Sequence, residues 1–101
     1  MQYTDDNTEF DWDFPKNDDN IEKHGINFDE ARHIWLRPDG LVIKEDTRHY
    51  NEDRFIAVGI LPDKRVLIVV HTYRDEVIWI ISAREAKPKE RKHYYENLHR
   101  P

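Results

Sequence analysis

The sequence predicts an α+β fold of the order β-α-α-β-β-β-β-α, with two N-terminal helices and one C-terminal helix against an antiparallel sheet of about four to five strands. The main observation is a pair of five-residue runs rich in Val and Ile, residues 66–70 and 77–81, around the charged residues 74–76. Branched side chains suit a pleated strand, so the runs predict a β-hairpin. The second observation is helical spacing of apolar residues before and after this hairpin.

The chain is expected to begin with a loose, acidic tail over residues 1–8. Residues 9–13 then alternate polar and aromatic side chains, which predicts a short strand with Phe10 and Trp12 on its buried face.

The first helix is expected over residues 14–24. Asp13 is an N-cap residue type, Pro15 needs no donor in the first turn, and Gly25 suits the left-handed position after the helix. The side chains expected on its inner side are Phe14, Asn17 and Ile21.

A second helix is expected to start after Asn27, which is again an N-cap residue type, with Glu30 three positions later. Its apolar stripe consists of Phe28, Ala31, Ile34 and Trp35. The sequence Arg-Pro-Asp-Gly at 37–40 predicts its end.

The remaining segments alternate between strands and turns until the last helix. Residues 41–43 predict a short strand, residues 44–53 a polar loop, and residues 54–60 a central strand that is apolar on both faces. A turn at residues 61–64 leads into the hairpin. Pro88, followed by Glu90, Tyr94 and Leu98 at four-residue spacing, predicts a charged C-terminal helix.

The composition predicts one folded domain over residues 1–101, with no cofactor and no metal site. The absence of cysteine excludes disulfides, thiolate catalysis and Cys-ligated zinc. No apolar run approaches the ~20 residues that cross a bilayer, and the N-terminus lacks a signal-peptide pattern, so a cytoplasmic protein without membrane contact is expected. The net charge of −5 disfavours avid nucleic-acid binding, although basic residues gather near the C-terminus.

Several motifs occur together in a recognisable order over roughly residues 9–95. They are Phe10-x-Trp12-Asp13-x-x-Lys16-x-x-x-Asn20-x-x-Lys23-His24-Gly25, Phe28-x-x-Ala31, Arg54-Phe55-Ile56-x-x-Gly59, Leu67-x-Val69-x-x-Thr72-x-Arg74, Ile80-Ile81-Ser82-Ala83-Arg84, and Glu90-Arg91 with Tyr94. This ordered set resembles the BrnT toxins. One departure is Trp79, which stands where many family members carry a basic residue.

The resemblance implies a RelE-like fold and a ribosome-independent endoribonuclease toxin of a type II toxin–antitoxin pair. It also implies a BrnA-type antitoxin that covers the toxin and contacts operator DNA, so that the toxin reaches DNA only indirectly. Two toxins bridged by an antitoxin dimer would form a heterotetramer. The alternative is a non-catalytic binding module of the same fold that pairs with an antitoxin-like DNA-binding partner.

Metal-free RNA cleavage requires activation of the 2′-hydroxyl, stabilisation of a charged phosphorane and protonation of the leaving oxygen. Arginine suits the second task because its planar fork pairs with two phosphate oxygens. Arg84 is the first candidate for it, followed by Arg74 and Arg54. The acid–base candidates are Lys23, His24, Glu52 and His71.

Four of these candidates also have a purely structural interpretation. Arg84 would then pair with a carboxylate, Lys23 and His24 would compensate the dipole of the first helix, and His71 would be a hydrogen-bonded strand residue. If the hairpin pairs across Asp75 and Glu76, strand alternation predicts that His71 shares a face with Ser82 and Arg84.

Overall fold

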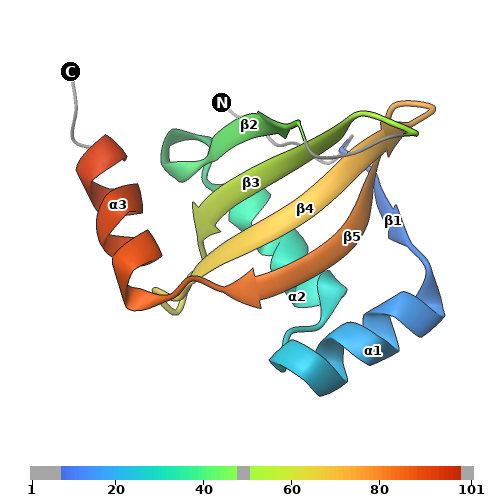
Figure 1. The fold of residues 1–101 in the computed structure, drawn as a ribbon, viewed down its shortest axis with the longest axis horizontal. Helices are drawn as coiled ribbons and strands as arrows, with labels where there is room; N and C mark the ends of the chain where they lie inside the picture. Colours follow the sequence, from blue (N-terminus) through green and yellow to red (C-terminus); the bar gives the residue numbers. More distant parts are fainter. Residues whose placement is uncertain (1–7, 48–50, 99–101) are drawn as a thin grey trace.

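Strands β4 (Val66–Arg74) and β5 (Val77–Glu85) form the predicted hairpin at the centre of the computed structural model, which describes residues 8–47 and 51–98 (Figure 1). The predicted tail lies outside the described residues except for Thr8. Asp75 and Glu76 form the two-residue turn, with φ of 51° and 68°. Positive φ at both positions is the geometry that matches the right-handed twist of the paired strands.

The sheet has five strands in the order β1-β5-β4-β3-β2. The other strands are β1 (Phe10–Trp12), β2 (Val42–Asp46) and β3 (Arg54–Ile60). β3 is therefore an interior strand, as predicted. The prediction of a wholly antiparallel sheet was wrong at one edge, because β1 pairs with β5 in parallel.

Helix α1 (Phe14–His24) has the predicted bounds and caps. The Asp13 side chain accepts from the backbone N–H of Lys16, and Gly25, at φ 72°, donates its N–H to the carbonyl of Ile21 at 2.8 Å. The predicted inner side was wrong for Phe14 and Ile21, which are 72% and 39% exposed. The helix instead packs through buried Asn20, as described below.

The predicted second helix is a short α-helix, α2 (Phe28–Ala31), continued by the 3₁₀ helices η1 (Arg32–Leu36) and η2 (Pro38–Gly40). Asn27 caps α2 by accepting from the backbone N–H of Asp29 at 2.9 Å. The four residues of the predicted stripe are buried. Ile34 approaches β3 so closely that a Cβ added to Gly59 would lie 2.8 Å from its Cβ.

The segment predicted as a loop over residues 44–53 is partly a strand, because Lys44, Glu45 and Asp46 extend β2 along β3. Polar side chains are accommodated there since β2 is an edge strand. Residues 48–50 lie outside the described residues. The C-terminal helix α3 (Pro88–Leu98) forms as predicted and buries Tyr94, whose hydroxyl donates to the carbonyl of Gly40.

A β-bulge interrupts the pairing of β4 with β5 between Val70 and His71. Val70 faces Ser82, but His71 faces Ile80, so Ile81 is the additional residue. An extra residue reverses the alternation of side chains beyond it. The predicted common face of His71 with Ser82 and Arg84 was therefore wrong.

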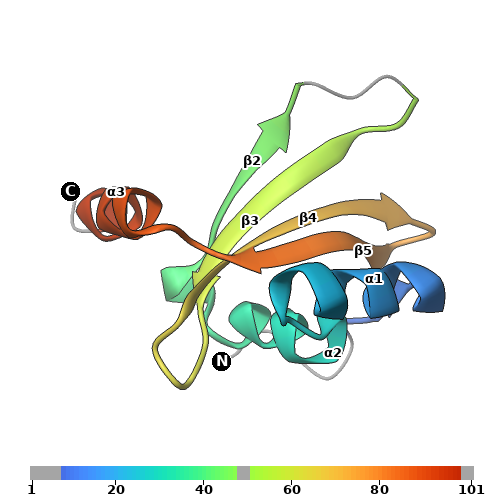
Figure 2. The ribbon, with the colours of Figure 1, turned by 60° about the horizontal axis from the view of Figure 1, so that its bottom comes forward.

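The two faces of the sheet differ in their cover. Figure 2 shows α1 and α2 against one face and α3 at one end of the sheet. The covered face holds the main core, including Phe28, Ile34, Leu67 and Ile80. We call the opposite surface the open face. Its residues by strand register are Asp11, Val42, Lys44, Asp46, Arg54, Ile56, Val58, Ile60, Val66, Ile68, Val70, Thr72, Arg74, Val77, Trp79, Ser82 and Arg84.

Candidate functional site

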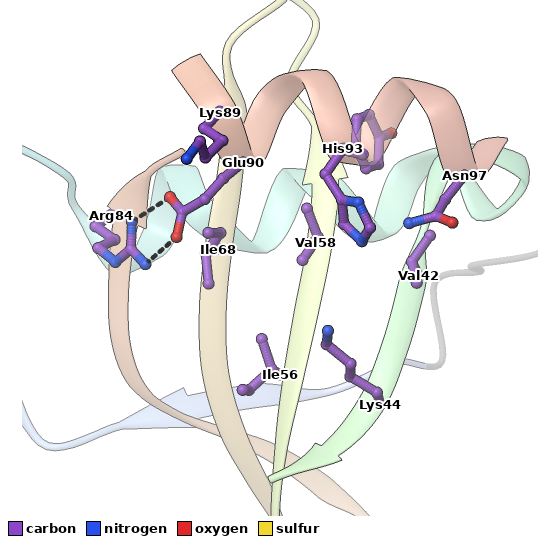
Figure 3. Close-up of a pocket in the computed structure, with 11 residues that line it drawn as sticks. Val42, Lys44, Ile56, Val58, Ile68, Arg84, Lys89, Glu90, His93 and Asn97 are labelled. Atoms are coloured by element: carbon purple, nitrogen blue, oxygen red, sulfur yellow. Dashed lines mark hydrogen bonds and ion pairs between the residues drawn. The ribbon is translucent and has the colours of Figure 1, made fainter. Parts of the chain in front are cut away.

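Arg84 lies near the end of β5 and is held by a carboxylate of α3. Its guanidinium donates two parallel hydrogen bonds of 2.8 Å to the two carboxylate oxygens of Glu90 (Figure 3). Its NH1 group also donates to the carbonyl of Glu85 at 3.4 Å. A parallel pair of charge-assisted bonds is the strongest geometry available to arginine. The carboxylate ion pair that was one interpretation of Arg84 is therefore present.

This pair shifts the protonation of both groups. Two hydrogen bonds from Arg84 and one from the backbone N–H of Lys87 lower the pKa of Glu90 to about 2. The hydrogen bonds to Glu90 raise the pKa of Arg84 above its ordinary value. The site therefore holds a fixed cation next to a fixed anion at all physiological pH values.

A groove of about 470 Å³ lies between the open face and α3, and Arg84 stands at its rim. Its apolar floor is Val42, Ile56, Val58 and Ile68, which are only half-buried. The polar side chains around this floor are Lys44, Arg84, Lys89, Glu90, His93 and Asn97. An apolar cleft with a few convergent polar groups is the usual form of a ligand site. Figure 3 shows the imidazole of His93 and the ammonium of Lys44 extending into this space.

Prediction from sequence missed His93, Lys44, Lys89 and Asn97. A signal was present for three of them, because Lys89, His93 and Asn97 recur every four residues and so share one face of α3. That face lies next to the stripe of Glu90 and Tyr94 that the prediction used. Lys44 had no such signal, since its segment was interpreted as a loop.

Three other predicted residues gather at the opposite end of the open face. Glu52 lies between two arginines, 3.5 Å from NH2 of Arg74 and 3.9 Å from Nε of Arg54. The Arg74 guanidinium also lies 4.5 Å from the centre of the Trp79 ring. The Glu52 carboxylate thus lies within ion-pair distance of two cations.

Lys23 and His24 are exposed at the end of α1 and line a different, smaller pocket of about 200 Å³. The same pocket is lined by Ile81 and Ser82 of the bulged part of β5. Within the described residues the structure therefore does not bring Lys23 and His24 into the groove beside Arg84.

Asn20 holds helix α1 against strand β5 beside this pocket. Its amide nitrogen donates to the carbonyls of Ile26 and Ala83 at 2.9 and 2.8 Å, and its oxygen accepts from the N–H of Ala83 at 3.1 Å. The side chain thus pairs with the edge of β5 as a neighbouring strand would. This buried contact explains why α1 packs through a polar residue.

His71 is fully buried on the covered face, away from the other candidates. Its ring contacts the rings of Trp35, Phe55 and Tyr73, with centroids 5.1 to 5.8 Å apart. Neither ring nitrogen has a hydrogen-bond partner among the described side chains and backbone. Burial lowers the pKa of His71, so it is a neutral core residue. Its ring does not line the groove beside Arg84.

Residues 8–47 and 51–98 contain no group of three His, Asp or Glu side chains that could hold a metal ion. In the same part of the chain no helix is long and apolar enough to span a membrane.

Comparison with known proteins identifies a protein family and a similar solved structure. Residues 12–90 match the family model described as the ribonuclease toxin BrnT of type II toxin–antitoxin systems. The crystal structure of the Brucella abortus ribonuclease toxin, BrnT, is similar with a TM-score of 0.58 and 26% sequence identity, over 79% of this chain and 97% of that one. No curated protein matches the chain.

Proposed function

Because the chain belongs to the BrnT family of ribonuclease toxins of type II toxin–antitoxin systems, we propose that its substrate is RNA bound in the groove beside Arg84 and cleaved without a metal ion or a ribosome. The observation that carries this proposal is the guanidinium of Arg84 at the rim of a groove that also holds an imidazole and two lysines. The predicted α+β fold and ribonuclease family are confirmed. The roles of individual residues are proposals.

The proposed reaction is an attack of the ribose 2′-oxygen on the adjacent phosphorus. The bond from phosphorus to the 5′-oxygen breaks, which leaves a 2′,3′-cyclic phosphate on one product and a 5′-hydroxyl on the other. One proton leaves the 2′-hydroxyl and one is given to the 5′-oxygen. Such a reaction needs a proton carrier and a cation at the phosphate, and no redox partner.

Arg84 is proposed to hold the phosphate. Its hydrogen bonds within the described residues use three of the five N–H groups of the guanidinium, so a phosphate oxygen has donors left without displacement of Glu90. Lys89 lines the groove near Arg84 and would add positive charge where the phosphorane forms, whereas Lys44 lines the far side of the groove on β2 (Figure 3). Arg54 and Arg74 are proposed to bind flanking phosphates at the other end of the open face.

His93 is proposed to transfer the proton, because an imidazole both donates and accepts and this one extends over the groove floor (Figure 3). Lys23 and His24, in the neighbouring pocket, are proposed to contact the RNA chain where it leaves the groove past Ser82. Glu52 is proposed to orient Arg54 and Arg74 rather than to act as a base.

The alternative function is a non-catalytic module that binds an antitoxin-like DNA-binding partner through the same surface. The observation that favours it is Glu90, whose negative charge lies within the proposed phosphate site. Both functions share the fold, so only activity separates them.

The test is incubation of the purified protein with single-stranded RNA in excess EDTA, followed by gel analysis and chemical identification of the product ends. Cleavage with cyclic phosphate ends is expected for the wild type, and a loss of at least a hundredfold for Arg84→Ala. The control is Arg32→Ala on the covered side, since the side chain of Arg32 is 38% exposed and also pairs with a carboxylate, that of Asp29, at 2.9 Å. Intact RNA with the wild type would support the non-catalytic module.

A type II toxin has a cognate antitoxin as its partner. We propose that this antitoxin is of the BrnA type, contacts operator DNA itself and joins two toxins in a heterotetramer. Light scattering on the co-expressed pair measures this stoichiometry directly.

A further inference from the structure

The contact of Arg74 with Trp79 lies at the turn end of the β4–β5 hairpin, on a strand with a paired neighbour on each side. Trp79 of β5 pairs with Thr72 of β4 on one side and with Asp11 of β1 on the other. Its ring is half-buried, and the guanidinium of Arg74 lies 4.5 Å from the ring centre. A large aromatic side chain in this position is expected under a helix, but α1, α2 and η1 cover the opposite face (Figures 1 and 2).

The positive charge of Arg74 is partly neutralised by Glu52, but the side chain of Arg74 remains accessible to solvent. Glu52 lies 3.5 Å from Arg74 and also 3.9 Å from Arg54. The side chain of Arg74 remains 48% exposed despite this ion pair. The exposed carboxylate of Asp11, next to Trp79 in the sheet, accepts from the backbone N–H of Trp12 at 2.8 Å.

We propose that Trp79 and Arg74 form a stacking platform for one unpaired nucleobase of the RNA. The inference rests on the proposed function and specifies its substrate as single-stranded RNA. A flat guanidinium over an indole ring presents a delocalised plane to the next flat group, and every base has such a face. A base inside a duplex has both faces stacked already, so the platform selects unpaired segments.

The position of the platform fits one strand of RNA that also reaches Arg84. Trp79 and Arg84 both lie on the open face of β5. They are five positions apart in sequence, which is about 15 Å at the rise of a strand. A phosphate at Arg84 and a base at Trp79 would therefore belong to nucleotides a short distance apart along one chain. Arg54, which lies on β3 at the same end of the open face as Trp79, would contact a phosphate next to the stacked base. The platform would hold one unpaired nucleotide at a fixed distance from the cleaved bond.

The test measures binding of a short single-stranded RNA made entirely of 2′-O-methyl nucleotides, which removes the attacking hydroxyl and so prevents cleavage. Trp79→Leu is expected to weaken binding about tenfold or more, because base stacking on an aromatic side chain contributes on that scale. Trp79→Phe is expected to retain most of the affinity. Scanning the oligonucleotide with single abasic positions is expected to show one sensitive position for the wild type and none for Trp79→Leu.

Tyr73→Leu is the matched control, because Tyr73 is also an aromatic residue at this end of the hairpin, is 47% exposed and lies on the covered face. Thermal unfolding of each variant separates loss of fold from loss of binding. Equal RNA affinity for wild type and folded Trp79→Leu overturns the platform but leaves the proposed function intact, whereas no RNA binding by the wild type overturns both. Loss of antitoxin binding alone in Trp79→Leu would assign the surface to the protein partner and also overturn the inference.

Discussion

The two carboxylate oxygens of Glu90 accept from the two terminal nitrogens of Arg84 at 2.8 Å each, so one ion pair joins the end of the central hairpin to the C-terminal helix. The same carboxylate accepts from the backbone N–H of Lys87 at 2.8 Å and thereby caps the start of α3. Glu90 therefore shapes the groove and also competes with any anion for Arg84.

Glu90→Gln is expected to raise the affinity for single-stranded RNA severalfold, because it removes a negative charge from the proposed phosphate site and retains the shape of the side chain. The melting temperature is expected to fall by a few degrees. Fluorescence anisotropy at two salt concentrations measures the first effect. Glu96→Gln is the control, since Glu96 also forms an ion pair on α3, with Lys92 at 3.4 Å. Unchanged affinity in Glu90→Gln would show that Arg84 does not bind the phosphate.

The Arg84–Glu90 pair is expected to remain intact in mild acid. The pKa of Glu90 is lowered to about 2 in the folded protein, whereas an unpaired glutamate titrates near 4.3. The pair therefore contributes its full stability above that unfolded value and loses it as the pH falls from about 4.3 towards 2. The difference in free energy of unfolding between wild type and Glu90→Gln, measured in urea from pH 6 to pH 2.5, should be constant at first and then shrink. If this difference in free energy of unfolding already changes between pH 6 and pH 5, the pKa of Glu90 is not lowered as described.

His71 is expected to make the protein less stable below about pH 6.5. Burial among three aromatic rings lowers its pKa, so the unfolded chain binds a proton that the folded chain does not. Stability is then complete above the unfolded pKa and decreases as the pH falls below it, by at most about 1.4 kcal/mol per pH unit. Urea unfolding of wild type and His71→Phe between pH 8 and pH 5 tests this, with exposed His24→Gln as the control. Parallel pH profiles for wild type and His71→Phe would show that another group titrates.

Asn20→Ala is expected to destabilise the fold by about 2–4 kcal/mol, because it leaves the N–H of Ala83 and two carbonyls unpaired. The loss should be concentrated where α1 meets β5. Hydrogen exchange of the Ala83 amide reports this local effect, and urea unfolding reports the total. Asp18→Ala, exposed on the same helix, should change the free energy of unfolding by less than about 0.5 kcal/mol. Slow exchange at Ala83 in the variant would mean that another group has replaced the amide.

Local patterns in the sequence determined most of the elements. Asp13 and Gly25 set the ends of α1 through a side-chain cap and a left-handed residue, both of which act within a few residues. The Val and Ile runs predicted the hairpin because strand preference is also local. The order of motifs identified the family, and Arg84 was found because it follows the last apolar run.

Tertiary structure decided which of the candidate residues lie together. The parallel pairing of β1 joins residues far apart in the chain, and no local pattern records it. The bulge at Ile81 reverses the face of every later side chain, so it separates His71 from Arg84, although simple alternation puts them together. The placement of α3 at one end of the open face brings Glu90 into contact with Arg84 and His93 into the same groove. The sequence by itself determined the elements and the cation at the end of the hairpin, because caps and strand preferences depend on near neighbours. The groove was decided by packing, because register and helix placement depend on the whole chain.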